Sequence, residues 1–400
     1  MLPQPSNTFQ GDFSSLWQLG TRQPLRHLTW DWWWWLIMLD DEQHSCGKQL
    51  MVLWSTKDND QVEVNGLPWK PQGRPGKDEH GGMLLDGMVC AWWFDGQRMI
   101  EPYIKRTCKM VALGDDHPSW PGPKGEGTGG GAVVPLLEDD FSMGLSSDHS
   151  SFWLRIQGDD DAVEKGAPST VSLSFTPWNP AMSVARPSSA TYAGEMGYDI
   201  LRVHGTKVSG RIDQQEVTGT AYFQKVCVQA PSPPWYWGVL HFEDGSYLDW
   251  FLPHVAFTMT SRDARPWKKR DSHHAALSQG GLFHDAKNKR TERFARVEVE
   301  KYTSTLQEGT EGQCPNAPLP CFRIKMWNGR TSVKIEVQAM QRAHWHFDQP
   351  TTAGLWSHLT YNEYPLTVNR LEIDDEFGQR RRHDFGWIRG NAEHAWGLLH

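Results

Sequence analysis

Asp249 is a carboxyl placed among aromatic and aliphatic residues in the stretch PPWYWGVLHFEDGSYLDWFLP. Asp244-Gly245 in its middle predicts a hairpin with a two-residue turn, and this register pairs Leu240 with Asp249. Tyr247 lies two residues earlier, on the same face of the strand. Removal from water raises the pKa of a carboxyl above its ordinary value of about 3.9. Asp249 could therefore hold a proton near neutral pH and deliver it to an alkene, unless it faces solvent or accepts a hydrogen bond from a loop.

The predicted register also gives the hairpin two distinct faces. Tyr236 and Phe251 share the face of Asp249, whereas Trp237 and His241 lie on the other face. Contact between His241 and Asp249 would then need a bulge that shifts the phase. We expect the aromatic residues of this region to contact a ligand: Tyr222, Tyr236, Trp237 and Phe251.

Tryptophan is unusually frequent, at 22 of 400 residues, and five of these lie in the segment TWDWWWWLIML, residues 29–39. Apolar residues at alternate positions predict a strand. Trp30, Trp32 and Trp34 would line a barrel pocket for a large apolar molecule, and Trp33 and Trp35 would pack outside the barrel. The two rows could be exchanged. A rigid aromatic core without a ligand is the alternative.

Further alternating runs predict an all-β protein built from two tandem antiparallel β-barrels. Examples are KQLMVLWSTK at residues 48–57 and SVKIEVQAM at residues 332–340. Composition becomes charged after residue 260. We therefore predict an N-terminal barrel domain at residues 1–262, a charged linker at 263–293 and a smaller barrel domain at 294–400.

Charge, apolar runs and cysteine spacing argue against several classes of function. A net charge of −8 argues against a nucleic-acid partner. The first residues lack a secretory signal, no apolar run reaches the roughly 20 residues of a membrane span, and six cysteines show no C-x-x-C spacing. These features predict a cytoplasmic protein, with contact to a membrane surface left open. His344 and His346 have a spacing that can bind zinc, but no third ligand is indicated, so we predict neither a metal nor a cofactor.

Three short motifs occur in a characteristic order: GTAYFQKV, WYWGVLHFEDGSYLDWF and a closing GNAEHAWG. This order resembles the carotenoid 1,2-hydratase (hydroxyneurosporene synthase) and AttH-like family, whose members consist of two lipocalin-like barrels in tandem. Tocopherol cyclases, fungal survival-factor proteins and decalin-forming Diels–Alderases are similar in architecture. The resemblance places the family's Tyr-x-Asp pair on Tyr247 and Asp249. Lys225 and Cys227 replace a His and a Trp of the hydratases, which is a departure from their pattern.

These observations predict a protein that binds a large hydrophobic ligand of isoprenoid or polyketide type. As an enzyme of the lyase class it would perform acid-catalysed hydration, isomerisation or cyclisation. Asp249 would be the general acid, and Tyr247 would orient or share its proton. The alternative is a non-catalytic lipid-binding or stress-related carrier that uses the same pocket.

Overall fold

The computed structural model describes residues 7–16, 25, 27–44, 46–59, 61–71, 76–120, 131–135, 141–256, 259, 274–303, 319–351 and 354–399. Within them the regular structure is almost entirely β, which confirms the predicted all-β fold. The helical segments are short: η1 (Ser14–Leu16), α1 (Asp160–Glu164), η2 (Ala193–Glu195) and η4 (Arg382–Asp384). None of the helices in the described part has the length and apolar character needed to cross a bilayer.

The first sheet has twelve strands and closes on itself because β11 pairs with β13. Its strands are β1 (Thr29–Leu39), β2 (Lys48–Lys57), β5 (Gly76–Lys77), β6 (Met83–Phe94), β7 (Met99–Gly114), β8 (Gly131–Pro135), β9 (Ser142–Leu145), β10 (Phe152–Gln157), β11 (Thr170–Pro177), β12 (Arg186–Thr191), β13 (Gly197–Ile212) and β14 (Gln215–Gln229). The ladders between them are antiparallel.

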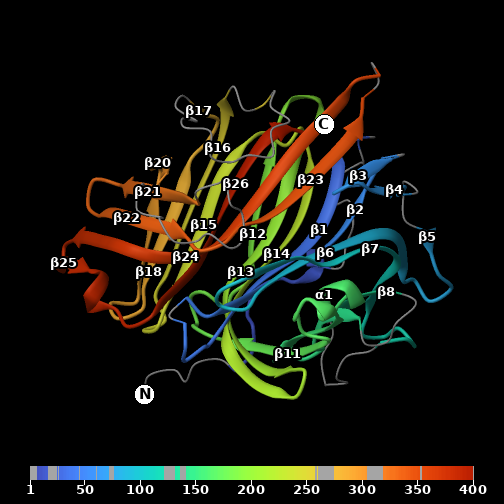
Figure 1. The fold of residues 1–400 in the computed structure, drawn as a ribbon, viewed down its shortest axis with the longest axis horizontal. Coiled ribbons are helices and arrows are strands. Elements are labelled where there is room, and N and C mark those ends of the chain that lie inside the picture. Colours follow the sequence, from blue (N-terminus) through green and yellow to red (C-terminus); the bar gives the residue numbers. More distant parts are fainter. Residues whose placement is uncertain are drawn as a thin grey trace.

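The second sheet has fourteen strands and is curled but open (Figure 1). Its strands are β3 (Val62–Val64), β4 (Leu67–Trp69), β15 (Trp235–Phe242), β16 (Tyr247–Ala256), β17 (His274–Ala276), β18 (Gly280–Asp285), β19 (Arg290–Phe294), β20 (Arg296–Thr303), β21 (Pro320–Trp327), β22 (Ser332–Ala339), β23 (Ala343–Pro350), β24 (Trp356–Asp375), β25 (Gly378–Arg381) and β26 (Ile388–Leu398). Strands β3 and β4 join it from the first half of the chain through β23.

The chain passes from the first sheet to the second between Gln229 and Trp235. Strands β17, β18 and most of β19 lie within the segment expected to be a charged linker, 263–293. Residues 257–258 and 260–273, around the expected boundary, lie outside the described residues. The division into domains at 262 and 294 stays a prediction.

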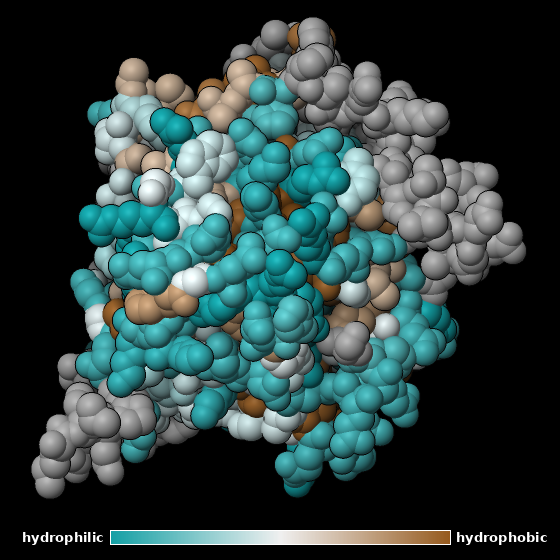
Figure 2. All heavy atoms as spheres, turned by 90° about the vertical axis from the view of Figure 1, so that its left-hand side faces the viewer, coloured by the Kyte–Doolittle hydropathy of each residue, from teal (hydrophilic) through white to brown (hydrophobic). Residues whose placement is uncertain are grey.

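Three large apolar cores and one small cluster occur among the described residues. The barrel core fills the interior of the first sheet and includes Trp33, Trp35 and Phe175. The concave core fills the hollow of the second sheet and includes Tyr236 and Trp250. The inter-sheet core lies between the two sheets, because its members come from β1, β2, β6 and β14 on one side and from β15, β16, β23 and β24 on the other. The outer face of the second sheet, over β21, β22 and β25, is mostly hydrophilic (Figure 2).

Strand β1 has the predicted bounds and the predicted alternation, but the two tryptophan rows are exchanged. Trp33 and Trp35 point into the barrel, and Trp30 and Trp34 belong to the inter-sheet core. Trp32 packs against that same core while keeping part of its surface exposed. The row expected to line the barrel pocket therefore faces the second sheet instead.

The hairpin of β15 and β16 differs from the predicted register by one residue. Val239, not Leu240, lies opposite Asp249, and the Phe242 N–H donates to the Ser246 carbonyl. The loop thus has three residues, with Gly245 at a φ of +87°, a value that favours glycine. A one-residue shift moves side chains to the opposite face, so His241 and Trp237 share the face of Asp249.

Candidate functional site

The Tyr247 hydroxyl donates a hydrogen bond to Asp249 Oδ2 at 2.8 Å. Tyr247 is fully buried in the inter-sheet core, and Asp249 is half-buried. Protein atoms crowd the Asp249 carboxyl, and this burial raises its pKa to about 6 although Tyr247 and Arg202 act in the opposite direction. Burial and the charge of Asp249 raise the pKa of Tyr247 well above its ordinary value. The pair therefore keeps a proton close to neutral pH at a partly accessible position.

Two neutral histidines pack against this pair. The His204 ring stacks on Tyr247 with a centroid distance of 4.9 Å and on Tyr222 at 6.0 Å. His241 Nε2 lies 2.9 Å from the His204 carbonyl oxygen and must donate to it, so its Nδ1 accepts from the Thr220 hydroxyl at 2.9 Å. Burial lowers the pKa of His241 to about 3. Burial also lowers the pKa of His204 well below its ordinary value, so both imidazoles are uncharged where they pack on Tyr247.

An aromatic cluster continues from this pair across the inter-sheet core. Trp34 meets Trp237 and Tyr222 edge to face, at 5.4 and 5.7 Å. Trp30 and Trp32 contact each other at 5.3 Å farther along β1. Six of the predicted site residues share this core or pack against it: Trp30, Trp32, Trp34, Tyr222, Trp237 and Tyr247.

Two predicted ligand-binding residues lie elsewhere. Tyr236 faces the concave core of the second sheet, where its ring stacks on His394 at 4.7 Å. The one-residue shift of the hairpin explains this placement, because it puts Tyr236 on the face opposite Asp249. Phe251 shares the alternation of Asp249 on β16 but is 39% exposed.

A second acidic pair lies at the other end of the aromatic cluster. Glu363 and Glu393 are directly opposite across β24 and β26, and the Tyr361 hydroxyl lies within hydrogen-bond distance of a carboxyl oxygen of each. Because this hydroxyl carries one proton, it donates to one carboxyl and accepts from the other when that carboxyl is protonated. Indole N–H groups of Trp34 and Trp92 donate to Glu363, and that of Trp235 donates to Glu393. Burial raises the pKa of Glu393 to about 7 and that of Glu363 well above its ordinary value.

Lys225, at a position where the resemblance led us to expect a histidine, lies on the other side of β14. It pairs with Trp33 in register, its Nζ lies 5.4 Å from the centre of that ring, and it forms a buried ion pair with Asp31. It also borders a cavity together with Cys227. Lys225 is therefore part of the first sheet's structure and not of the Asp249 site.

No family model matches the chain, and none of the curated proteins matches it. Among solved structures, the chain is similar to a protein described as AttH from Nitrosomonas europaea, with 14% identity and a TM-score of 0.46 over 94% of this chain and 98% of that one. It is also similar to kievitone hydratase from Nectria haematococca, with 11% identity and a TM-score of 0.36 over 98% of this chain and 97% of that one.

Several residues of the site escaped prediction from sequence. His241 was expected to lie on the face opposite Asp249, and neither His204 nor Glu393 was among the predicted site residues. Glu363 carried no local signal.

Proposed function

We propose that the chain binds a large hydrophobic ligand beside the inter-sheet core and protonates one of its double bonds from Asp249. The observation that supports this is the hydrogen bond from Tyr247 to a carboxyl that is desolvated yet partly accessible. A carboxyl of this kind is protonated in a useful fraction of molecules near neutral pH. Tyr247 orients the carboxyl, and it stabilises the carboxylate once the proton has left.

The chemical step forms one C–H bond. The proton passes from Asp249 to one alkene carbon, whose π electrons form the new bond, and a cation remains on the other carbon. Aromatic faces such as those of Trp34, Tyr222 and Trp237 stabilise positive charge. Addition of water, loss of a neighbouring proton or ring closure then gives hydration, isomerisation or cyclisation, and a released proton returns to Asp249.

Deuterium incorporation tests this proposal without knowledge of the product. Isoprenoid and polyketide polyenes are incubated with the protein in D₂O, and mass spectrometry measures deuterium bound to carbon. Asp249→Asn should abolish incorporation while ligand-induced quenching of tryptophan fluorescence persists. Asp374→Asn, at an exposed position of β24, is the matched control. Binding without incorporation by the unmodified protein would instead favour a carrier.

A further inference from the structure

Arg186 and Arg202 lie directly opposite each other across β12 and β13. Like charges at such positions destabilise a sheet. No carboxylate of the described residues forms an ion pair with either guanidinium. Arg186 donates through Nη2 to the Ala181 carbonyl at 2.6 Å, and its Nε is buried without a hydrogen-bond partner within the described part of the chain. The arginine pair thus has no ion-paired carboxylate of its own among the described residues, and Asp249 is the carboxylate that acts on both arginines electrostatically.

The same lateral row leads to the Asp249 site. Arg202 pairs with Gln224 on β14, and Gln224 pairs with Trp34 on β1. Residues in one lateral row point to the same face of a sheet. Because Trp34 belongs to the inter-sheet core, both arginines lie on the face that looks toward the second sheet.

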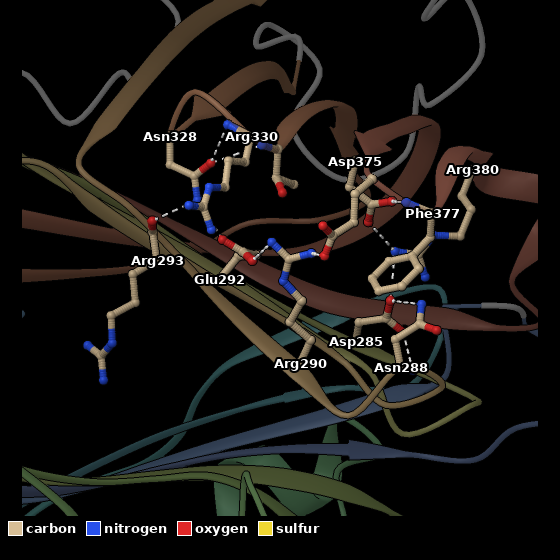
Figure 3. A network of polar contacts seen from close by, with 12 residues as sticks. Asp285, Asn288, Arg290, Glu292, Arg293, Asn328, Arg330, Asp375, Phe377 and Arg380 are labelled. Carbon is tan, nitrogen blue, oxygen red and sulfur yellow. Dashed lines mark hydrogen bonds and ion pairs between the residues drawn. The ribbon is translucent and has the colours of Figure 1, made fainter.

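A third arginine approaches from the second sheet. Asp249 pairs with Leu282 on β18, and Leu282 pairs with Arg293 on β19, so Arg293 shares the face of Asp249. Figure 3 shows the Arg293 side chain extending away from the polar network, which its main-chain carbonyl joins through Asn328. Arg290 on the same strand behaves differently, because it is paired with carboxylates within that network.

The three arginines exert their electrostatic effect on the same neighbouring residues, His204 and Asp249. Each of them lowers the pKa of the buried His204, whose ring stacks on Tyr247, and Arg202 and Arg293 also act on Asp249. Arg186 and Arg202 are half-buried and Arg293 is exposed. Two arginines of the first sheet and one of the second therefore lie on facing surfaces of the two sheets, act electrostatically on Asp249, and keep part of their surface accessible to a ligand.

We propose that Arg186, Arg202 and Arg293 bind the oxyanion head group of the hydrophobic ligand, either a carboxylate or a phosphate. This inference rests on the proposed function and narrows its substrate to an amphiphile: an unsaturated chain with an anionic end near Asp249. Guanidinium groups suit this role because their planar donors match carboxylate and phosphate oxygens in pairs. The ligand charge would relieve the repulsion between Arg186 and Arg202.

The test uses three probes with one tetraene chain: cis-parinaric acid, its alcohol and its monophosphate ester. Energy transfer from tryptophan to the tetraene reports binding. The acid or the phosphate should bind about tenfold more tightly than the alcohol, and added salt should weaken this preference. The tighter of the two anions identifies the head group.

Arg186→Gln, Arg202→Gln and Arg293→Gln should each bring anion affinity toward that of the alcohol and leave alcohol affinity unchanged. Arg211→Gln, an exposed residue of β13 paired with Glu216, is the matched control. If a half-buried variant does not fold, exposed Arg293→Gln and Arg202→Lys decide, and the lysine variant should keep part of the preference. Equal affinity of the unmodified protein for the acid, the phosphate and the alcohol, or an equal loss of anion and alcohol affinity in the variants, overturns the anion site. If the anion site is overturned but deuterium incorporation still depends on Asp249, the proposed function stands. If the protein prefers anions but incorporates no deuterium, the anion site stands and the proposed acid catalysis is wrong.

Discussion

The carboxyl groups of Glu363 and Glu393 lie directly opposite each other across β24 and β26, joined by the hydroxyl of Tyr361. Two buried carboxylates this close repel each other, which favours a proton on the pair. Glu363 belongs to the second sheet, whereas its indole donors Trp34 and Trp92 belong to the first. The acidic pair therefore connects the two sheets through charge-assisted hydrogen bonds.

Glu393→Gln should change how stability depends on pH. The folded protein holds a proton on this pair at pH values where the unfolded chain, with a glutamate pKa near 4.5, has released it. The folded pKa is raised, so this contribution to the free energy of unfolding is complete below pH 4.5 and is lost as pH rises toward 7. Each pKa unit corresponds to about 1.4 kcal/mol.

The measurement is the difference in free energy of unfolding between the unmodified protein and Glu393→Gln, from denaturant titrations between pH 5 and 8. This difference should decrease as pH rises. Exposed Glu298→Gln on β20 should give a difference that does not vary with pH. A constant difference for Glu393→Gln as well would contradict a shared proton.

His241 should make the free energy of unfolding depend on pH in the opposite direction. Its folded pKa is lowered to about 3 from 6.5, so the unfolded chain binds the proton first. Stability is then present above pH 6.5 and is lost as pH falls. His241→Gln keeps a donor for the His204 carbonyl and an acceptor for Thr220, so it should be less sensitive to acid than the unmodified protein.

Denaturant unfolding at pH 8 and pH 5 checks this expectation. His241→Phe is the comparison, because it leaves both partners unsatisfied and should be about 1–3 kcal/mol less stable than His241→Gln at either pH. If His241→Gln and the unmodified protein lost the same free energy of unfolding between pH 8 and pH 5, His241 would not be kept neutral by the fold.

Alanine substitutions of Trp35 and Trp32 should distinguish a role in packing from a role in ligand binding. Trp35 is fully buried and stacks on Phe175 at 4.1 Å, so Trp35→Ala should cost about 3–5 kcal/mol. Trp32 is half-buried, and Trp32→Ala should cost about 1 kcal/mol. The alanine variant of Trp32 should instead weaken the binding of cis-parinaric acid. Thermal unfolding and energy transfer measure the two effects, and unchanged affinity in Trp32→Ala would remove this residue from the ligand site.

Local sequence patterns predicted the features that depend on residues close in the chain, namely strand bounds and the alternation of side chains. The alternation in residues 29–39 fixed a strand with two tryptophan rows, and β1 has those bounds. Both rows are apolar, so alternation could not decide which row enters the barrel. The hairpin shows the same limit, because an Asp-Gly dipeptide fits a two-residue turn and also the three-residue loop that forms here.

Pairings between distant strands had no such local signal. Glu363 meets Glu393 only because β24 and β26 adopt one particular register, and Arg186 meets Arg202 only through that of β12 and β13. Register is set by the packing of whole faces, which a single sequence does not display. Asp249 was singled out as a candidate because its aromatic neighbours lie close in the chain.

Lys225 and Asp31 provide a test of whether the departure from the hydratase motif is structural. Their side chains are 4% and 6% exposed and form an ion pair. Lys225→Met would leave a buried carboxylate without its partner and should cost about 3–5 kcal/mol, whereas Asp31→Leu combined with Lys225→Met should cost much less. A double-mutant cycle from denaturant unfolding measures the coupling. Because Lys225 points away from the inter-sheet core, the folded double variant should still incorporate deuterium, and a loss of incorporation at unchanged stability would bring Lys225 into the reaction.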